Sequence, residues 1–535
     1  MTTEDKEAGR EARIVLLCGA AALAVTLVYT IAGVIVRPTM FSDSAWGFLG
    51  WYGGKGLRFN HVAQVNPDDI ATDVLSFATW WTPGQHVLPG LLERAGLPLG
   101  LAIIVVDALF SLIGLAGWYS LYRGFGFPAT SSAIALAIIV FARHFALPFG
   151  IYNGGEILLF GVAPWFLLLV WRLRRLTWIA IVPLAAGVVA MIFAKLSGLV
   201  VSASAIGAAV MAPVGPWLSH ERIRRAAIAA ITLGVVGAVF YFGWFSRGGT
   251  PASSGEPTPW AWKYVVGYAA YAAAGAWSAA LSFGDLGAYL FLSPSRPVFA
   301  TALPVYWLLL PAALITAAFA IWRLREKHAE YLRFALFFWL GTGVVLVAIT
   351  ARGGDLGIED RHMRLVSLVL WVGLVHAVLG TPSRRLLGVF GAVVLVSSLY
   401  GISSATMHVV TNFEHPLGGR GFRHRTADAA VLAFIRSIDT STSDPRSTLI
   451  FVTSPEIGLE VRNVRAASNH AEFESLERLR QFRYHGQVPK LYVLVPEPLV
   501  HNGKAEVILR SFADYPFDKW QATPIGSFVS YSQIR

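Results

Sequence analysis

The chain has 535 residues, of which 55% are hydrophobic and only 14% are charged. Soluble globular domains carry about a quarter charged residues, so this composition excludes an ordinary soluble protein. The net charge of +11 could suggest a nucleic-acid-binding protein, but the arginines gather in short segments between apolar runs, which is typical of membrane proteins. The one cysteine, Cys18, lies inside such a run and leaves no disulfide within the chain.

The first apolar run follows the acid-containing segment MTTEDKEAGREARIV and continues to Val36. A secretory signal would have a shorter apolar core and a small-residue cleavage site, so we expect a retained membrane helix. With the later runs of about 20 apolar residues, we expect about eleven membrane helices. The runs lie near residues 14–36, 99–122, 130–148, 156–171, 177–194, 198–218, 226–245, 299–322, 332–350, 363–380 and 386–403.

The arginine-rich segments set the expected orientation. With a cytoplasmic N-terminus, WRLRRLT, SHERIRRA, WRLREKHAEYLR and TPSRRL all fall on the cytoplasmic side. We therefore predict a multi-pass membrane protein with a cytoplasmic N-terminus. The apolar, aromatic residues 260–293, in the outer segment 246–298, are expected to form amphipathic helices at the outer interface.

The last part of the chain differs in character. TLIFVTSP, AEFESLERLRQFRYH and KLYVLVPEP predict a strand, a helix and a strand. The predicted fold class is therefore mainly α, with a polytopic membrane module over residues 1–410 and a soluble, extracytoplasmic α/β domain over residues 411–535.

Asp43 is the first candidate for chemistry, because it follows the first apolar run at the start of the outer loop 37–98. A solvated interfacial acid or a helix cap is the simpler interpretation. The length of the loop favours a functional role, since long loops in compact structures are usually functional. The polar and aromatic side chains that the loop adds to Asp43 are Lys55, Arg58, Trp80, Trp81, Gln85 and His86.

Asp43, followed by Gly-Leu-x-Phe-Asn and then by TPGQHVLPGLL before the second helix, resembles the GT-C superfamily of membrane glycosyltransferases. The similar branch uses polyprenyl-phosphate sugars and includes protein O-mannosyltransferases and lipid A aminoarabinose transferases. The segments YNGGEILLFGVAP, FAKLSGLV and EDRHMRL are similar to later motifs of that branch. The resemblance implies functional roles for Glu156, Lys195, Arg361 and His362.

This chain departs from the branch at the first-loop acid. Asp43 is followed by Ser44, where many relatives have a second acid, so the resemblance implies no metal site built from an acid pair. The sequence also has no Walker A loop, no Gly-x-Ser-x-Gly and no His/Cys metal spacing. We therefore expect no cofactor, and a divalent metal is an alternative that the ligand spacing does not support.

Transfer of a sugar from a lipid phosphate needs a base for the acceptor hydroxyl and positive charge for the departing phosphate. Asp43 is the candidate base. The candidate phosphate ligands are Lys195, Arg361, His362 and Arg143, and the candidate substrate-binding residues are Glu156, His86, Gln85, Arg58 and Trp81. Basic side chains that only anchor helices at the interface are the alternative interpretation.

We therefore expect an inverting glycosyltransferase that acts on the outer face of a bacterial plasma (inner) membrane. It would move a monosaccharide from a polyprenyl-phosphate donor to a hydroxyl of a glycan, lipid or protein acceptor, with membrane lipids and no nucleic acid as partners. The alternatives are a polysaccharide polymerase or ligase, a flippase or transporter, and a scaffold subunit. A transporter would predict repeated halves, which the sequence does not show.

Overall fold

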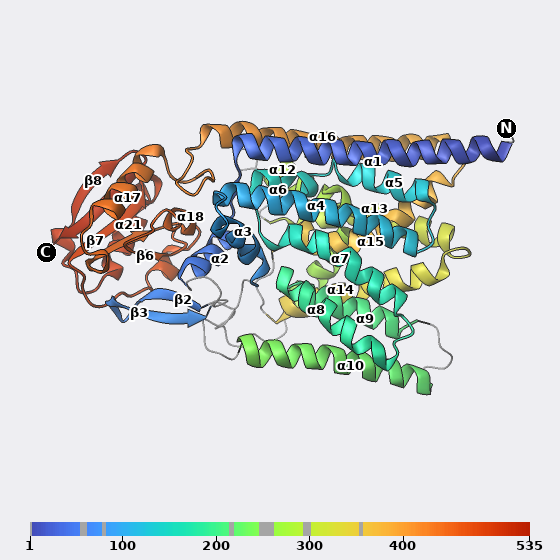
Figure 1. Cartoon of the computed structure of the whole chain (residues 1–535), viewed down its shortest axis with the longest axis horizontal. Coiled ribbons are helices and arrows are strands. Elements are labelled where there is room, and N and C mark those ends of the chain that lie inside the picture. Colours follow the sequence, from blue (N-terminus) through green and yellow to red (C-terminus); the bar gives the residue numbers. More distant parts are fainter. Residues whose placement is uncertain are drawn as a thin grey trace.

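The computed structural model of the chain describes residues 3–53, 61–77, 82–212, 219–245, 262–292, 301–352 and 357–534. Within these ranges, long helices form one block, and a sheet-containing domain covers one end of it (Figure 1). The predicted fold class is confirmed in both parts, a polytopic helical module and a C-terminal α/β domain.

In the described residues, eight helices are long and apolar enough to cross a membrane, and the bent pair of α5 (Ala129–Ile139) and α6 (Arg143–Gly150) adds a ninth if it is one span. The shorter helices α8 (Ile181–Ala194) and α9 (Gly198–Val210) match two further predicted runs. Each predicted run thus contains a helix within its described residues. The eight are α1 (Thr3–Val36), α4 (Leu99–Gly124), α7 (Gly155–Arg172), α10 (His220–Phe240), α13 (Leu303–Leu324), α14 (Ala329–Ala351), α15 (Asp360–Leu379) and α16 (Arg384–Glu414).

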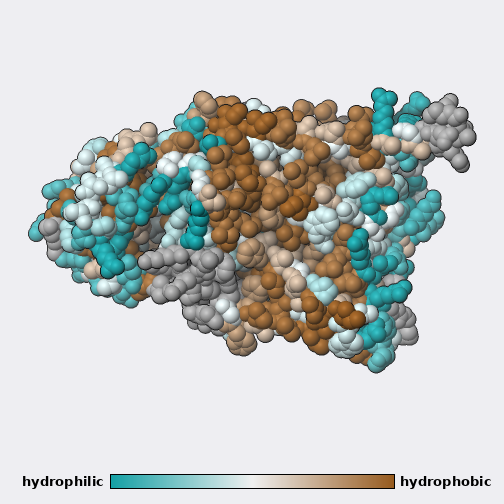
Figure 2. Space-filling model, in the orientation of Figure 1, coloured by the Kyte–Doolittle hydropathy of each residue, from teal (hydrophilic) through white to brown (hydrophobic). Residues whose placement is uncertain are grey.

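The surface of the helical block has the pattern of a membrane protein. Figure 2 shows a hydrophobic band between two hydrophilic ends, and the exposed apolar side chains of α1, α10 and α16 contribute to this band. Such side chains fit a hydrocarbon environment, in which exposed polar groups are costly. α16 begins at Arg384 at the end that holds the N-terminus and reaches the C-terminal domain at Glu414 (Figure 1).

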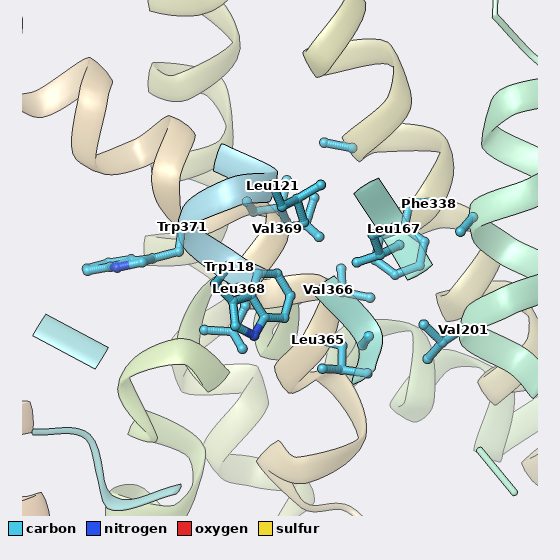
Figure 3. Close-up of a cluster of buried hydrophobic side chains, with 14 of the residues drawn as sticks. Trp118, Leu121, Leu167, Val201, Phe338, Leu365, Val366, Leu368, Val369 and Trp371 are labelled. Atoms are coloured by element: carbon cyan, nitrogen blue, oxygen red, sulfur yellow. The ribbon is translucent and has the colours of Figure 1, made fainter. Parts of the chain in front are cut away.

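The inside of the block is filled with large side chains whose polar atoms bond to backbone carbonyls. Figure 3 shows Trp118 and Trp371 in this core. The indole N–H of Trp118 donates to the carbonyl of Phe160 at 3.2 Å, and that of Trp371 donates to the carbonyl of Ala135 at 3.0 Å. A Cβ at Gly117 of α4 would lie 2.7 Å from the Pro164 ring of α7, so this glycine lets the two helices approach closely. This packing fixes the position of α7, whose first turn reaches the candidate site.

The segment predicted to lie at the interface forms α11 (Trp262–Ser278) and α12 (Phe283–Leu292) within its described residues. α11 packs against α13, α14 and α15, where it buries Tyr271 and several alanines. α11 is therefore part of the helical block. The depth of α11 and α12 in the membrane stays a prediction.

Within its described residues, the loop of residues 37–98 contains two helices and a hairpin. α2 (Ser42–Gly53) and α3 (Gly84–Arg94) pack on each other, and β2 (His61–Asn66) pairs antiparallel with β3 (Asp69–Phe77). Short strands β1 (Thr39–Met40) and β4 (Ile151–Tyr152) pair in parallel and join the loop to the segment before α7.

Two arginines of the C-terminal domain hold the first outer loop. Arg465 donates to the Asp73 carboxylate at 2.6 Å and to the Ile70 carbonyl at 2.6 Å, which binds the hairpin. Arg420 donates to Glu93 of α3 at 3.1 Å and lies over the ring of Tyr52 of α2 at 3.6 Å. The loop and the domain therefore form one layer at this end of the helical block.

The C-terminal domain contains a five-stranded sheet in the order β6-β5-β7-β9-β8. Strands β6, β5 and β7 run parallel to one another, and β9 runs antiparallel to both of its neighbours, β7 and β8. The predicted strands near 448 and 490 are confirmed as β5 and β7. The elements are α17 (Ala429–Ser441), β5 (Thr448–Val452), α18 (Pro455–Gly458), β6 (Arg465–Ser468), α19 (Leu476–Leu479), β7 (Lys490–Pro496), α20 (Glu497–His501), α21 (Lys504–Ser511), β8 (Gln521–Ile525) and β9 (Phe528–Ile534).

The helix predicted over AEFESLERLRQFRYH is confirmed only for the four residues of α19, and the rest of the segment is not helical. Lys504 of α21 donates to the carbonyls of Ala471 and Glu472 at 3.0 and 3.2 Å, which holds the start of this segment in an irregular conformation. Tertiary contacts have overridden the helix propensity of its charged residues.

Candidate active site

A cavity of about 450 Å³ lies at the end of the helical block that faces the C-terminal domain. Side chains of α2, α3, α7, α9, α14 and α15, and of the turn between α8 and α9, line it. The predicted site residues that line this cavity are Asp43, Gln85, Glu156, Lys195, Arg361 and His362. Segments separated by hundreds of residues thus bring together most of the described candidates.

Asp43 lies in the first turn of α2 and is exposed at the cavity wall. The N-terminus of a helix carries partial positive charge, which favours a carboxylate in its ionised form. Asp43 is also one of the charges that act on Arg361 across the cavity. The arrangement therefore places a solvent-accessible carboxylate at the end of a cationic cavity that faces the C-terminal domain.

Glu156, Lys195 and Arg361 form the charged centre of the cavity. The buried Glu156 lies in the first turn of α7 and accepts a hydrogen bond from the Lys195 ammonium. The Nε of Arg361 lies 4.0 Å from the same carboxylate oxygen and 2.8 Å from Glu359. A Cβ at Gly155 would lie 2.7 Å from the carbonyl of Ala194, so glycine is needed where the start of α7 meets the end of α8.

Gln85 and His86 have different positions, although they are adjacent on α3. Gln85 lines the cavity, and its side-chain oxygen accepts from the backbone N–H of Gly155 at 3.3 Å. His86 is buried outside the cavity lining, beside Gly47 of α2. Burial lowers the pKa of His86 to about 3, so this ring is neutral at physiological pH. His86 supports α2 rather than facing a substrate.

Arg143 does not line the cavity, although the sequence suggested it as a phosphate ligand. It pairs with Asp285 of α12, and His144 lies 3.5 Å from the same carboxylate. These contacts make the half-buried Arg143 part of a structural charge network.

That network also contains a group of side chains that a metal could use. Ligand atoms of His144, Asp285 and Asp360 lie within 4.8 Å of one another. The carboxylate of Asp360, however, accepts from the Tyr306 hydroxyl at 3.1 Å and from the backbone N–H of Asp285 at 2.9 Å. A metal would compete with these bonds and with Arg143, so the residues favour a hydrogen-bonded network.

Arg364 is a cavity residue that the sequence interpretation missed. It follows Arg361 by three residues on α15, is 5% exposed, and lies over the Phe160 ring at 5.0 Å. Its Nη2 has no hydrogen-bond partner among the described residues. The spacing of three residues in EDRHMRL was a usable signal, because it places both arginines on one face of a helix.

The inner wall of the cavity is apolar. Side chains of α7, α9 and α14 extend it away from the charged centre, between helices of the block. These side chains are Leu159, Phe160, Leu199, Val200, Val201, Leu346 and Ile349. The cavity is therefore amphipathic, with charged groups near the outer end and hydrocarbon surface deeper in. The remaining candidates Arg58 and Trp81, with Lys55 and Trp80, lie outside the described residues.

Comparisons with known proteins identify similar solved structures. No protein-family model and no curated protein matches the chain. ArnT from Cupriavidus metallidurans in the apo state is 11% identical, with a TM-score of 0.49 and 97% of each chain covered. The same protein bound to undecaprenyl phosphate is 12% identical, with a TM-score of 0.48 and 97% of each chain covered.

An oligosaccharyltransferase from Archaeoglobus fulgidus in the apo form is 11% identical, with a TM-score of 0.46, over 95% of this chain and 74% of the other. Both proteins are similar to this chain over most of its length. At identities of 11–12%, the function has to be argued from the residues of the cavity.

Proposed function

We propose that the protein is a membrane glycosyltransferase that moves a monosaccharide from a polyprenyl-phosphate donor to an acceptor hydroxyl on the outer face of the plasma membrane. One observation carries this proposal: a single amphipathic cavity joins an exposed carboxylate, a cluster of cations and a hydrocarbon wall. A base, a phosphate site and a lipid site are the three parts that this reaction needs.

The cations fit a phosphate leaving group. Lys195, Arg361 and Arg364 carry three positive charges, which the carboxylates of Glu156 and Asp43 offset in part. As the bond between the sugar carbon and the phosphate oxygen breaks, negative charge grows on the phosphate. Fixed cations in a cavity shielded from water stabilise that charge more strongly in the transition state than in the donor. Arg364, with an unpartnered Nη2, has donor capacity ready for a phosphate oxygen.

Asp43 supplies the base. In the proposed step, its carboxylate takes the proton of the acceptor hydroxyl while the hydroxyl oxygen forms a bond to the anomeric carbon. The bond from that carbon to the phosphate oxygen breaks, and its electron pair leaves with the polyprenyl phosphate. Attack on the side opposite the leaving group inverts the configuration of the sugar.

The apolar wall suits the lipid part of the donor. Leucine, valine and phenylalanine side chains of α7, α9 and α14 can cover isoprenoid chain carbons next to the charged centre. Burial of each methylene-sized group contributes about 0.8 kcal/mol, so a chain of several isoprene units gains substantial affinity.

A transfer assay tests the proposal. Purified protein in lipid nanodiscs is given radiolabelled polyprenyl-phosphate monosaccharides, and the sugar released to water or transferred to an acceptor is measured. We expect one or more donors to be consumed by the wild-type protein. A correctly folded protein that binds these donors without cleaving any of them, or carries them across vesicles, would overturn the proposal in favour of a transporter.

A further inference from the structure

A loop of the C-terminal domain lies against the helix that carries Asp43. Trp46 follows Asp43 by one turn on α2, and its indole N–H donates to Nε2 of His470. The two rings are 5.2 Å apart. The carboxylate charge of Asp43 also acts on His470. The loop of residues 469–475 therefore reaches the outer end of the cavity, beside the proposed base.

Several hydrogen bonds hold the 469–475 loop in one conformation. The backbone N–H of Asn469 donates to the carbonyl of Val452 at 3.3 Å, and the Asn469 side chain accepts from the N–H of Ala471 at 3.0 Å. The Lys504 ammonium bonds to two further carbonyls of the loop. A loop fixed in this way presents its side chains with little loss of conformational entropy on binding.

This fixed loop holds a large apolar ring in solvent. Phe473 is 74% exposed, and its ring lies edge-on to His470 at a centroid distance of 6.2 Å. Hydrogen bonds fix the loop, so the Phe473 ring stays in solvent next to the helix that carries Asp43. Trp46, His470 and Phe473 thus form a run of aromatic rings that leads outward from Asp43.

The polar groups around these rings indicate the kind of ligand. Glu472 and Glu474 flank Phe473, Arg478 is paired with Glu474 at 3.1 Å, and the Lys504 ammonium is bonded to the loop. The loop itself therefore engages Arg478 and Lys504, and the charge of Arg425 also acts on Glu472. Aromatic faces attract the apolar C–H face of a sugar ring, and carboxylates accept hydrogen bonds from its hydroxyls.

We propose that Trp46, His470 and Phe473 form the acceptor subsite, and that its ligand is a sugar ring whose free hydroxyl Asp43 deprotonates. The inference rests on the proposed glycosyl transfer and adds that the acceptor is a glycan. His470 acts as a positioning residue, because it holds the loop against α2 through Trp46.

The test uses the full-length protein in nanodiscs and the octyl glycosides of glucose, galactose, mannose and arabinose as acceptor probes. Phe473→Ala is compared with Phe473→Trp and with Phe517→Ala. Phe517 is a matched control, since it is an exposed phenylalanine of the same domain whose ring lies under the guanidinium of Arg510 of α21. We expect Phe473→Ala to lower the ratio of transfer to donor hydrolysis about tenfold through a higher acceptor KM, and Phe473→Trp to restore it.

Saturation-transfer NMR with methyl glycosides of the same sugars, without donor, is the second measurement. Signal transfer to sugar protons that Phe473→Ala removes and Phe517→Ala keeps would support the subsite. An unchanged acceptor KM in Phe473→Ala, or equal loss of hydrolysis and transfer, would overturn it while leaving glycosyl transfer intact. If the wild-type protein cleaves no donor yet binds a glycoside through Phe473, the proposed transfer fails and a sugar site remains.

Discussion

Lys195 donates a hydrogen bond to the buried Glu156, and this ion pair joins the turn between α8 and α9 to the first turn of α7. The pair lies in the cavity that Asp43 also lines. A buried carboxylate needs such a partner, because a lone charge in a low-dielectric site is costly. Glu156 thus fixes the ammonium of Lys195 at the place where the proposed phosphate departs.

The ion pair predicts non-additive effects of substitution. If Glu156 acts by positioning Lys195, Glu156→Gln and Lys195→Met should each lower transfer about tenfold or more, and the double variant should be little worse than Lys195→Met alone. Donor KM and turnover in the transfer assay measure this. Arg174→Gln breaks the exposed pair with Glu330 at the other end of the block and should leave turnover unchanged. Additive losses would show that Glu156 has a separate role.

Asp43→Asn should abolish transfer, because the amide keeps the shape of the side chain and cannot accept the proton. Loss of a general base typically costs about 10²–10⁴-fold in rate. Asp68→Asn, at an exposed acid of the turn between β2 and β3, is the matched control and should retain full activity. Thermal unfolding should be the same for both variants. Retained turnover in Asp43→Asn would remove Asp43 from the role of base.

Arg364→Gln should weaken donor binding, because it removes a buried guanidinium whose Nη2 has no partner within the described ranges. We expect donor KM to rise about tenfold or more, in line with the strength of charge-assisted bonds. Arg364→Lys should restore little, since an ammonium cannot reproduce the planar fork. Arg385→Gln, at the exposed start of α16, is the control. If Arg364→Gln binds donor normally and only loses stability, Arg364 is a packing residue.

Glu472 predicts a pH dependence of stability. Burial, and then the nearby Glu456, raise the pKa of the Glu472 carboxyl to about 7. Between the ordinary carboxyl pKa and about 7 the folded state binds more protons than the unfolded chain, so this contribution to stability is lost as the pH rises through that range.

Glu472→Gln should therefore flatten the profile and stabilise the protein at pH 8 relative to the wild type. Thermal unfolding in nanodiscs at pH 5 and pH 8 measures this. Glu477→Gln, on the exposed side of α19, serves as the control. Parallel profiles for Glu472→Gln and the wild type would contradict the raised pKa.

Local sequence information was sufficient for the helical block and for much of the cavity. Hydropathy predicts each apolar run because a membrane helix satisfies its own backbone groups. The short motifs around Asp43, Glu156, Lys195 and Arg361 indicated residues that the structure brings to one cavity. These residues lie at helix ends, where a polar side chain interrupts an apolar run and is visible without an alignment.

The features that the sequence could not predict depend on contacts between residues far apart in the chain. The sequence suggested Arg143 as a phosphate ligand, but in the structure it pairs with Asp285, which lies 142 residues later in the chain. The segment after β6 has the composition of a longer helix than the four residues of α19, and Lys504 holds its start in an irregular conformation. The contact of His470 with Trp46 spans 424 residues and has no local signal.

The hairpin of β2 and β3 rests on Arg465, which lies 392 residues after Asp73 in the chain. The ribosome makes the first outer loop early, but the side chain that holds this hairpin appears only after every membrane helix has been synthesised. The outer layer around Asp43 is therefore completed late in biogenesis. A chain that stops after α16 would carry all the charged groups of the cavity and still lack the surface on which its outer loop settles.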